Sequence, residues 1–94
     1  MPARQYRVEV SASAARDLTA FAKRPPAGDV VQRLDTAIVS LKEDPRPAGA
    51  KKLVSGGDGW RLRVGDYRIL YQVDDGAKVV VIYRVMSRGD VYRA

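Results

Sequence analysis

The sequence predicts an α+β domain with the element order β-α-α-β-β-β, in which an N-terminal helical hairpin packs on a mainly antiparallel sheet. Two stretches in the first half of the chain repeat apolar residues every three or four positions, which is typical of amphipathic helices. The second half contains strand-length stretches that alternate or are continuously apolar. With 94 residues the chain can bury one hydrophobic core, so a single domain over residues 1–94 is expected.

The first half predicts one strand and two helices. Residues 6–10 alternate apolar and polar side chains, as a half-buried strand does. Ser11 and Ser13 are candidate N-caps of the first helix, because a serine oxygen can accept from the open amides of a first turn. The apolar positions of that helix are Ala14, Ala15, Leu18, Phe21 and Ala22. Two prolines at 25 and 26 end it, and a second helix begins near Gly28 or Asp29. The apolar stripe of the second helix is formed by Val30, Val31, Leu34, Ala37, Ile38 and Leu41.

The second half predicts a loop followed by a three-stranded meander. The loop covers residues 45–59; its glycine-rich end lacks the Gly-Lys-Ser/Thr of a phosphate-binding loop and does not open a helix. Alternation over 60–64 and a strand over 67–73 flank a tight turn at Gly65–Asp66. The third strand covers 78–85, and its continuous apolar run is typical of a central strand. The residues from 86 onward are predicted to form a loop and a short mixed end.

Composition excludes several kinds of chemistry. The chain has no cysteine and no histidine, which removes disulfides, zinc fingers, thiolate nucleophiles and the commonest acid–base side chain. No metal site and no cofactor are therefore expected. The longest apolar run, residues 79–83, is far shorter than the ~20 residues that cross a bilayer, so no membrane partner and a cytosolic location are expected.

The net charge is +6, and the surplus lies in the second half, where residues 46–94 carry ten Lys/Arg against five Asp/Glu. A basic surplus of this kind favours a polyanionic partner, with charge for solubility as the alternative. Alternation puts Arg61 and Arg63 on the face opposite Trp60, where Arg68, Arg84 and Arg88 of the neighbouring segments can join them. The guanidinium fork binds phosphate oxygens bidentately. The alternative interpretation is a solvated strand face. Tyr67 and Tyr71 are interpreted as core or sheet aromatics.

The segment from Trp60 to Tyr71, the run 79–85 and the ending Arg88-Gly89-Asp90-Val91-Tyr92-Arg93 resemble the RelE/ParE superfamily of type II toxin–antitoxin toxins, most closely its RelE branch. The resemblance covers the whole chain and implies a RelE-like fold. It implies a toxin that enters the ribosome and cleaves mRNA there without a metal, and that a cognate acidic antitoxin silences. The catalytic residues it implies are Arg61, Arg63, Arg68, Arg88 and Tyr92. Further RNA-binding residues are Lys51, Lys52, Arg84 and Arg93.

Two alternatives belong to the same resemblance: a ParE-type inhibitor of DNA gyrase without nuclease activity, and a degenerate homologue that only binds antitoxin. The sequence also departs from strong nucleases of the family. Arg61 and Arg63 stand where some relatives carry lysines, and arginine cannot act as a general base because it stays protonated. In the last loop, Ser87 and Gly89 stand where many relatives have histidine and a second arginine. Tyr92 could position or deprotonate the attacking hydroxyl or stack on a base; its alternative role is to anchor the chain end to the sheet.

Overall fold

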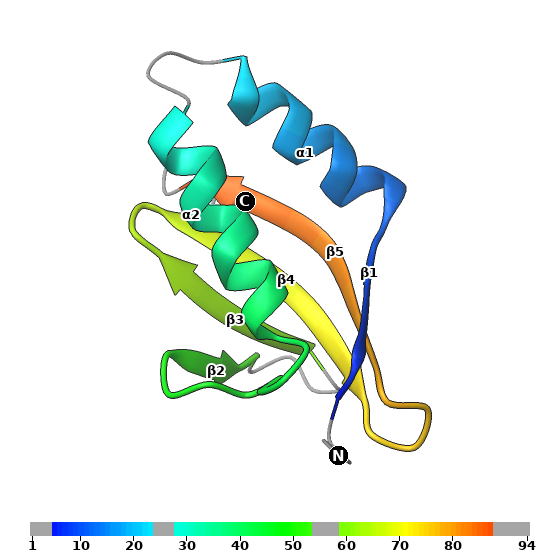
Figure 1. Ribbon diagram of the computed structural model, residues 1–94. Coiled ribbons are helices and arrows are strands. Elements are labelled where there is room, and N and C mark those ends of the chain that lie inside the picture. The colour runs from blue at the N-terminus through cyan, green and yellow to red at the C-terminus, as the bar shows by residue number, and fades with distance from the viewer. Residues whose placement is uncertain (1–4, 24–27, 54–58, 88–94) are drawn as a thin grey trace.

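Two helices cover one face of a five-stranded sheet and leave the other face open (Figure 1). The computed structural model describes residues 5–23, 28–53 and 59–87 of the chain. In chain order the elements are β1 (Arg7–Val10), α1 (Ala12–Ala22), α2 (Gly28–Ser40), β2 (Ala50–Lys52), β3 (Gly59–Val64), β4 (Tyr67–Asp74) and β5 (Val79–Ser87).

The strands lie in the order β1-β5-β4-β3-β2. β1 is parallel to β5, and the other three pairings are antiparallel. The helical hairpin between β1 and β2 carries the chain from one edge of the sheet to the other. The predicted α+β fold, with a helical hairpin on a mainly antiparallel sheet, is confirmed. Neither helix is long and apolar enough to cross a membrane within the described residues.

The start of α1 is fixed by Ser11, one of the two predicted caps. Its Oγ accepts from the amide of Ala14 at 3.2 Å, and its own amide donates to the carbonyl of Ile82 on β5 at 2.9 Å. The cap therefore joins the first helix to the centre of the sheet while it satisfies an open amide of the first turn. α1 then buries Ala14 and Phe21 against the core.

The core lies between the helices and the inner face of the sheet. β5 is an interior strand of the sheet, since it lies between β1 and β4, and its residues Val80 and Ile82 are fully buried. Tyr71 is also fully buried, and Tyr67 packs partly buried against the core, so both predicted sheet aromatics are confirmed. The remaining buried members are Ala14, Phe21, Leu34, Ile38, Leu41, Leu62, Ile69, Val73 and Val85.

The predicted loop over 45–59 is wrong at residues 50–52, which form β2 and pair with residues 60–62 of β3. Three residues are too few to show the alternation of a strand, and the neighbouring prolines and glycines are typical of a loop. The third strand of the meander is also longer than predicted, because Met86 and Ser87 belong to β5.

The loop before β2 is held by an ion pair that no sequence spacing indicates. Arg46 donates from Nη1 and Nη2 to Asp75 in the β4–β5 turn at 3.1 and 2.8 Å. The Tyr6 hydroxyl donates to the same carboxylate at 2.6 Å. The Arg46 guanidinium also lies 5.3 Å from the ring centroid of Trp60. These contacts connect the N-terminal strand, the loop and the turn.

Replacing Asp75 by asparagine is expected to make the folding stability less dependent on pH under acid conditions. The hydrogen bonds from Arg46 and Tyr6 lower the pKa of Asp75 from 3.8 to about 2. A carboxyl whose pKa is lower in the folded than in the unfolded protein stabilises the fold at any pH above its unfolded pKa. This stabilisation is lost as the pH falls from about 3.8 toward 2. Urea midpoints of the wild type and Asp75→Asn should therefore converge across this window. An unchanged difference between them would contradict the assignment.

Candidate nucleic-acid interface

Four basic side chains line one hollow on the open face of the sheet. This basic pocket has a volume of about 450 Å³ and is lined by Lys51, Arg61, Arg63 and Arg68, together with Gly49 and Gly65. Three different strands contribute the cations. Of the five arginines predicted to gather on this face, Arg61, Arg63 and Arg68 line the pocket, and Lys51, predicted as an RNA-binding residue, joins them from β2.

The strand register brings these cations together. Lys51 of β2 lies opposite Arg61 of β3, and Arg63 of β3 lies opposite Arg68 of β4. Arg61 and Arg63 are two residues apart and so share a face. Directly opposed side chains have Cβ atoms about 4.5–5.5 Å apart, so the two cationic pairs form one compact patch.

No carboxylate of the described residues forms an ion pair with the cations of the pocket. Two of its arginines donate to backbone oxygens: Arg63 Nε to Gly65 O at 3.1 Å, and Arg68 Nη1 to Tyr67 O at 3.4 Å. Within the part of the chain that the structure describes, none of the ion pairs involves these arginines or Lys51. Like charges opposite each other on a sheet are destabilising, so the arrangement is unfavourable without an anion.

Two further predicted site residues that the structure describes, Lys52 and Arg84, do not line the pocket. Lys52 lies opposite Trp60, a core-packing residue, and so belongs to the opposite face from Lys51. Arg84 forms an ion pair with Asp17 of α1, with 2.9 Å between Nε and Oδ2. The predicted Arg88, Tyr92 and Arg93 lie outside the described residues.

The turn between β3 and β4 depends on Gly65. Its φ of +59° is the only positive value in this two-residue loop, the pattern of a type II′ turn with glycine first. A Cβ at Gly65 would also lie 3.1 and 3.3 Å from the guanidinium nitrogens of Arg33 on α2. Glycine here fixes the register that sets Arg63 opposite Arg68.

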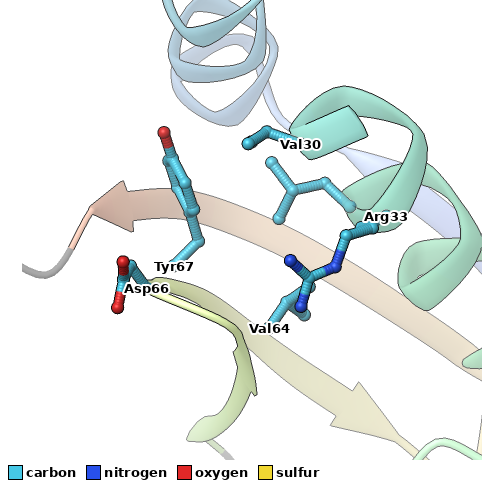
Figure 2. Close-up of a pocket in the computed structure, with 6 residues that line it drawn as sticks. Val30, Arg33, Val64, Asp66 and Tyr67 are labelled. Carbon is cyan, nitrogen blue, oxygen red and sulfur yellow. The ribbon is translucent and has the colours of Figure 1, made fainter. Parts of the chain in front are cut away.

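A second, smaller hollow of about 80 Å³ lies on the helix side of that turn (Figure 2). Arg33 reaches it from α2, with Val30, Val64, Asp66 and Tyr67 around it. Arg33 is its single cation, whereas phosphate recognition is built from several convergent donors. Arg33 is not part of the apolar stripe predicted for the second helix, and helical periodicity carries no signal for its approach to the distant turn at Gly65. We therefore place the candidate site in the basic pocket.

Among the described residues, no three His, Cys, Asp or Glu side chains cluster in a way that could hold a metal ion.

Replacing Arg68 by glutamate is expected to raise stability, because the like-charge pair with Arg63 becomes an opposite-charge pair. Cross-strand pairs of this kind contribute about 0.2–1 kcal/mol. For a domain of this size, that raises the melting temperature by a few degrees. Thermal unfolding at low salt measures it. Arg68→Gln is the control and should give a smaller rise, and a fall in melting temperature for both variants would contradict the repulsion.

Comparisons with known proteins agree on one family. The family model described as the ParE toxin of the type II toxin–antitoxin system parDE matches residues 8–92. Toxin RelG of Mycobacterium tuberculosis is 34% identical over 88 residues, which are 94% of this chain and 97% of that toxin. The RelBE2 toxin–antitoxin complex of the same organism contains a chain with a TM-score of 0.73 and 31% identity, over 89% of this chain and 99% of that one. The RelE–RelB complex of Pyrococcus horikoshii gives a TM-score of 0.75 and 29% identity, over 90% of this chain and 97% of its own.

Proposed function

The chain belongs to the RelE/ParE family of type II toxin–antitoxin toxins, and we propose that it is a ribosome-dependent endoribonuclease that cleaves mRNA and so inhibits translation. The observation that carries the proposal is the basic pocket. Its four cations, Lys51, Arg61, Arg63 and Arg68, converge from three strands and have no carboxylate partner within the described ranges.

The chemistry suits these side chains. In RNA cleavage by internal attack, the 2′-oxygen bonds to the adjacent phosphorus while the bond to the 5′-oxygen breaks, which leaves a 2′,3′-cyclic phosphate and a 5′-hydroxyl. Negative charge grows on the phosphate oxygens during this step. Preorganised cations aimed at that charge are usually the largest catalytic contribution. In the proposal Arg61 and Arg68 hold the phosphate.

Arginine cannot take the proton from the 2′-hydroxyl, since it stays protonated at any physiological pH. In the proposal the phenolate form of Tyr92 takes this proton, or Tyr92 positions the hydroxyl for attack while water takes it. Water supplies the proton that the departing 5′-oxygen needs to become a hydroxyl. Arg88 acts as a further phosphate ligand, and Arg93 binds RNA beyond the cleaved bond. These three roles rest on the family resemblance, because the residues lie outside the described ranges.

The proposed silencing partner is a cognate acidic antitoxin. RelBE2 and the Pyrococcus RelE–RelB pair are toxin–antitoxin complexes. An acidic segment folding over the open face would neutralise the basic pocket and bury the apolar residues beside it, such as Leu70 and Met86, which are half-buried without a partner.

The test uses purified protein on ribosomes programmed with a defined mRNA, with mapping of the new 3′ ends. The proposal expects cuts that need both ribosome and toxin, and that added chelator does not prevent. Intact mRNA at saturating protein would overturn the nuclease proposal.

A ParE-type gyrase inhibitor is the second candidate, because the matching family model is described as a ParE toxin. One fold can host both activities. Gyrase supercoiling assays with the same preparation separate them: inhibition with uncut mRNA favours the gyrase target. Toxicity that persists in Arg68→Ala combined with Tyr92→Phe points the same way.

A further inference from the structure

Arg84 lies in line with the basic pocket, although its guanidinium is turned elsewhere. In the register of the sheet, Arg84 is opposite Leu70, and Leu70 is opposite Arg61. Strands lie about 4.8 Å apart, so the Cα atoms of Arg61 and Arg84 are about 10 Å apart in one row across the sheet. By position Arg84 is therefore the next cation beyond the pocket.

Asp17 of α1 forms an ion pair with Arg84 and so keeps its guanidinium away from the basic pocket. Arg84 Nε donates to Asp17 Oδ2 at 2.9 Å. The same carboxylate oxygen accepts from the amide of Val85 at 2.8 Å, so the backbone fixes Asp17 independently of the arginine. The pairing of β1 with β5 ends at Ile82, and α1 supplies the polar partners of β5 beyond that point.

The ion pair is open to competition. The Arg84 side chain is 46% exposed and that of Asp17 is 19% exposed. Water screens a pair of this kind, and its contribution to stability is small. An RNA phosphodiester offers the guanidinium two oxygens for a bidentate contact, whereas Arg84 now contacts a single carboxylate oxygen of Asp17.

We propose that Arg84 is an additional phosphate ligand of the basic pocket, and that its ion pair with Asp17 lowers the affinity for RNA. The inference rests on the proposed function, because it assumes that RNA crosses the open face. A strand bound at Arg61 and continuing along the row meets Arg84 next. Gaining that contact requires the arginine to leave Asp17, which lowers the net affinity. Asp17 keeps its bond to the Val85 amide, so the α1–β5 junction persists.

The experiment neutralises Asp17 and measures binding of a short single-stranded RNA by fluorescence anisotropy over a salt series. Asp17→Asn removes the charge while its amide oxygen can still accept from Val85. This variant should bind about three- to ten-fold more tightly. Its salt dependence should steepen by up to about 0.7 in log–log slope, the value for one added phosphate contact on a single strand.

The decisive arm is a double-mutant cycle with Arg84→Gln. This change should weaken binding by about two-fold or less in the wild type but by about three- to ten-fold in Asp17→Asn. Asp35→Asn on the exposed side of α2 makes the same change in net charge and should alter binding by less than two-fold. Equal tightening by Asp17→Asn in the Arg84→Gln background, or by Asp35→Asn, would overturn the inference.

A second measurement does not depend on how well Asp17→Asn folds. The Nε–H resonance of Arg84 in wild-type protein should move on addition of RNA, and a resonance that stays in place at saturation would overturn the inference. If the mutant cycle or the resonance overturns the inference, the proposed function still stands provided that the double variant Arg61→Gln/Arg68→Gln abolishes RNA binding. If the wild type does not bind RNA through those two arginines, the proposed function fails and the inference fails with it.

Discussion

Replacing both Arg61 and Arg68 by glutamine is expected to slow mRNA cleavage on programmed ribosomes by at least about 100-fold. Removing a single preorganised donor from a site that stabilises developing negative charge typically costs 10²–10³ in rate. Arg61 and Arg68 line the same pocket, from neighbouring strands, and lack carboxylate partners among the described residues, so the loss falls on transition-state charge and not on an internal ion pair. Single-turnover cleavage at saturating toxin measures the chemical step.

Arg7→Gln combined with Arg16→Gln is the matched control. Both residues are exposed and lie on β1 and α1, away from the basic pocket, and the double change removes the same two charges. The control should cleave within about two-fold of the wild type. An equal loss in both double variants would mean that net charge, and not the pocket, carries the activity.

The faces of the long strands could be predicted from the sequence. Alternation around Trp60 placed Arg61 and Arg63 on the open side, and the turn at Gly65–Asp66 set the hairpin that brings Arg68 opposite Arg63. Period and turn chemistry are local properties, so they can be read without knowledge of the rest of the fold.

The separation of Lys51 from Lys52 could not be predicted. They are adjacent on a strand of three residues, and their faces depend on which residues of β3 they pair with. The position of Arg84 depends on distant structure in the same way. The register of β4 and β5 shifts near Leu70, and the pairing of β1 with β5 ends at Ile82. Beyond Ile82 the edge of β5 has no strand partner in β1, and Asp17 of α1 contacts the Arg84 guanidinium there. The contact spans 67 residues of sequence.

The second large effect concerns stability. Replacing Tyr71 by phenylalanine is expected to lower the free energy of unfolding by about 1–3 kcal/mol, because the change deletes one buried hydrogen-bond partner and leaves the other. Tyr71 is fully buried on β4, and its hydroxyl donates to the carbonyl of Pro45, itself buried, at 2.7 Å. A 1 kcal/mol loss in a domain of this size lowers the melting temperature by about 4–8 °C.

The pH dependence of this loss identifies its cause. Burial raises the pKa of Tyr71 from 10.0 to about 12. A raised pKa gives stability that is complete below the unfolded value and is lost as the pH rises from about 10 to about 12. Tyr71→Phe has no such group, so the two proteins should converge in urea midpoint over that window, by at most about 2–3 kcal/mol at 1.36 kcal/mol per unit. Tyr67→Phe is the control: its ring still packs 4.8 Å from that of Phe21, and it should change stability by less than about 0.5 kcal/mol at neutral pH. The same stability for Tyr71→Phe and the wild type from pH 7 to pH 12 would mean that packing of the ring, and not the buried hydroxyl, joins the loop at Pro45 to the sheet.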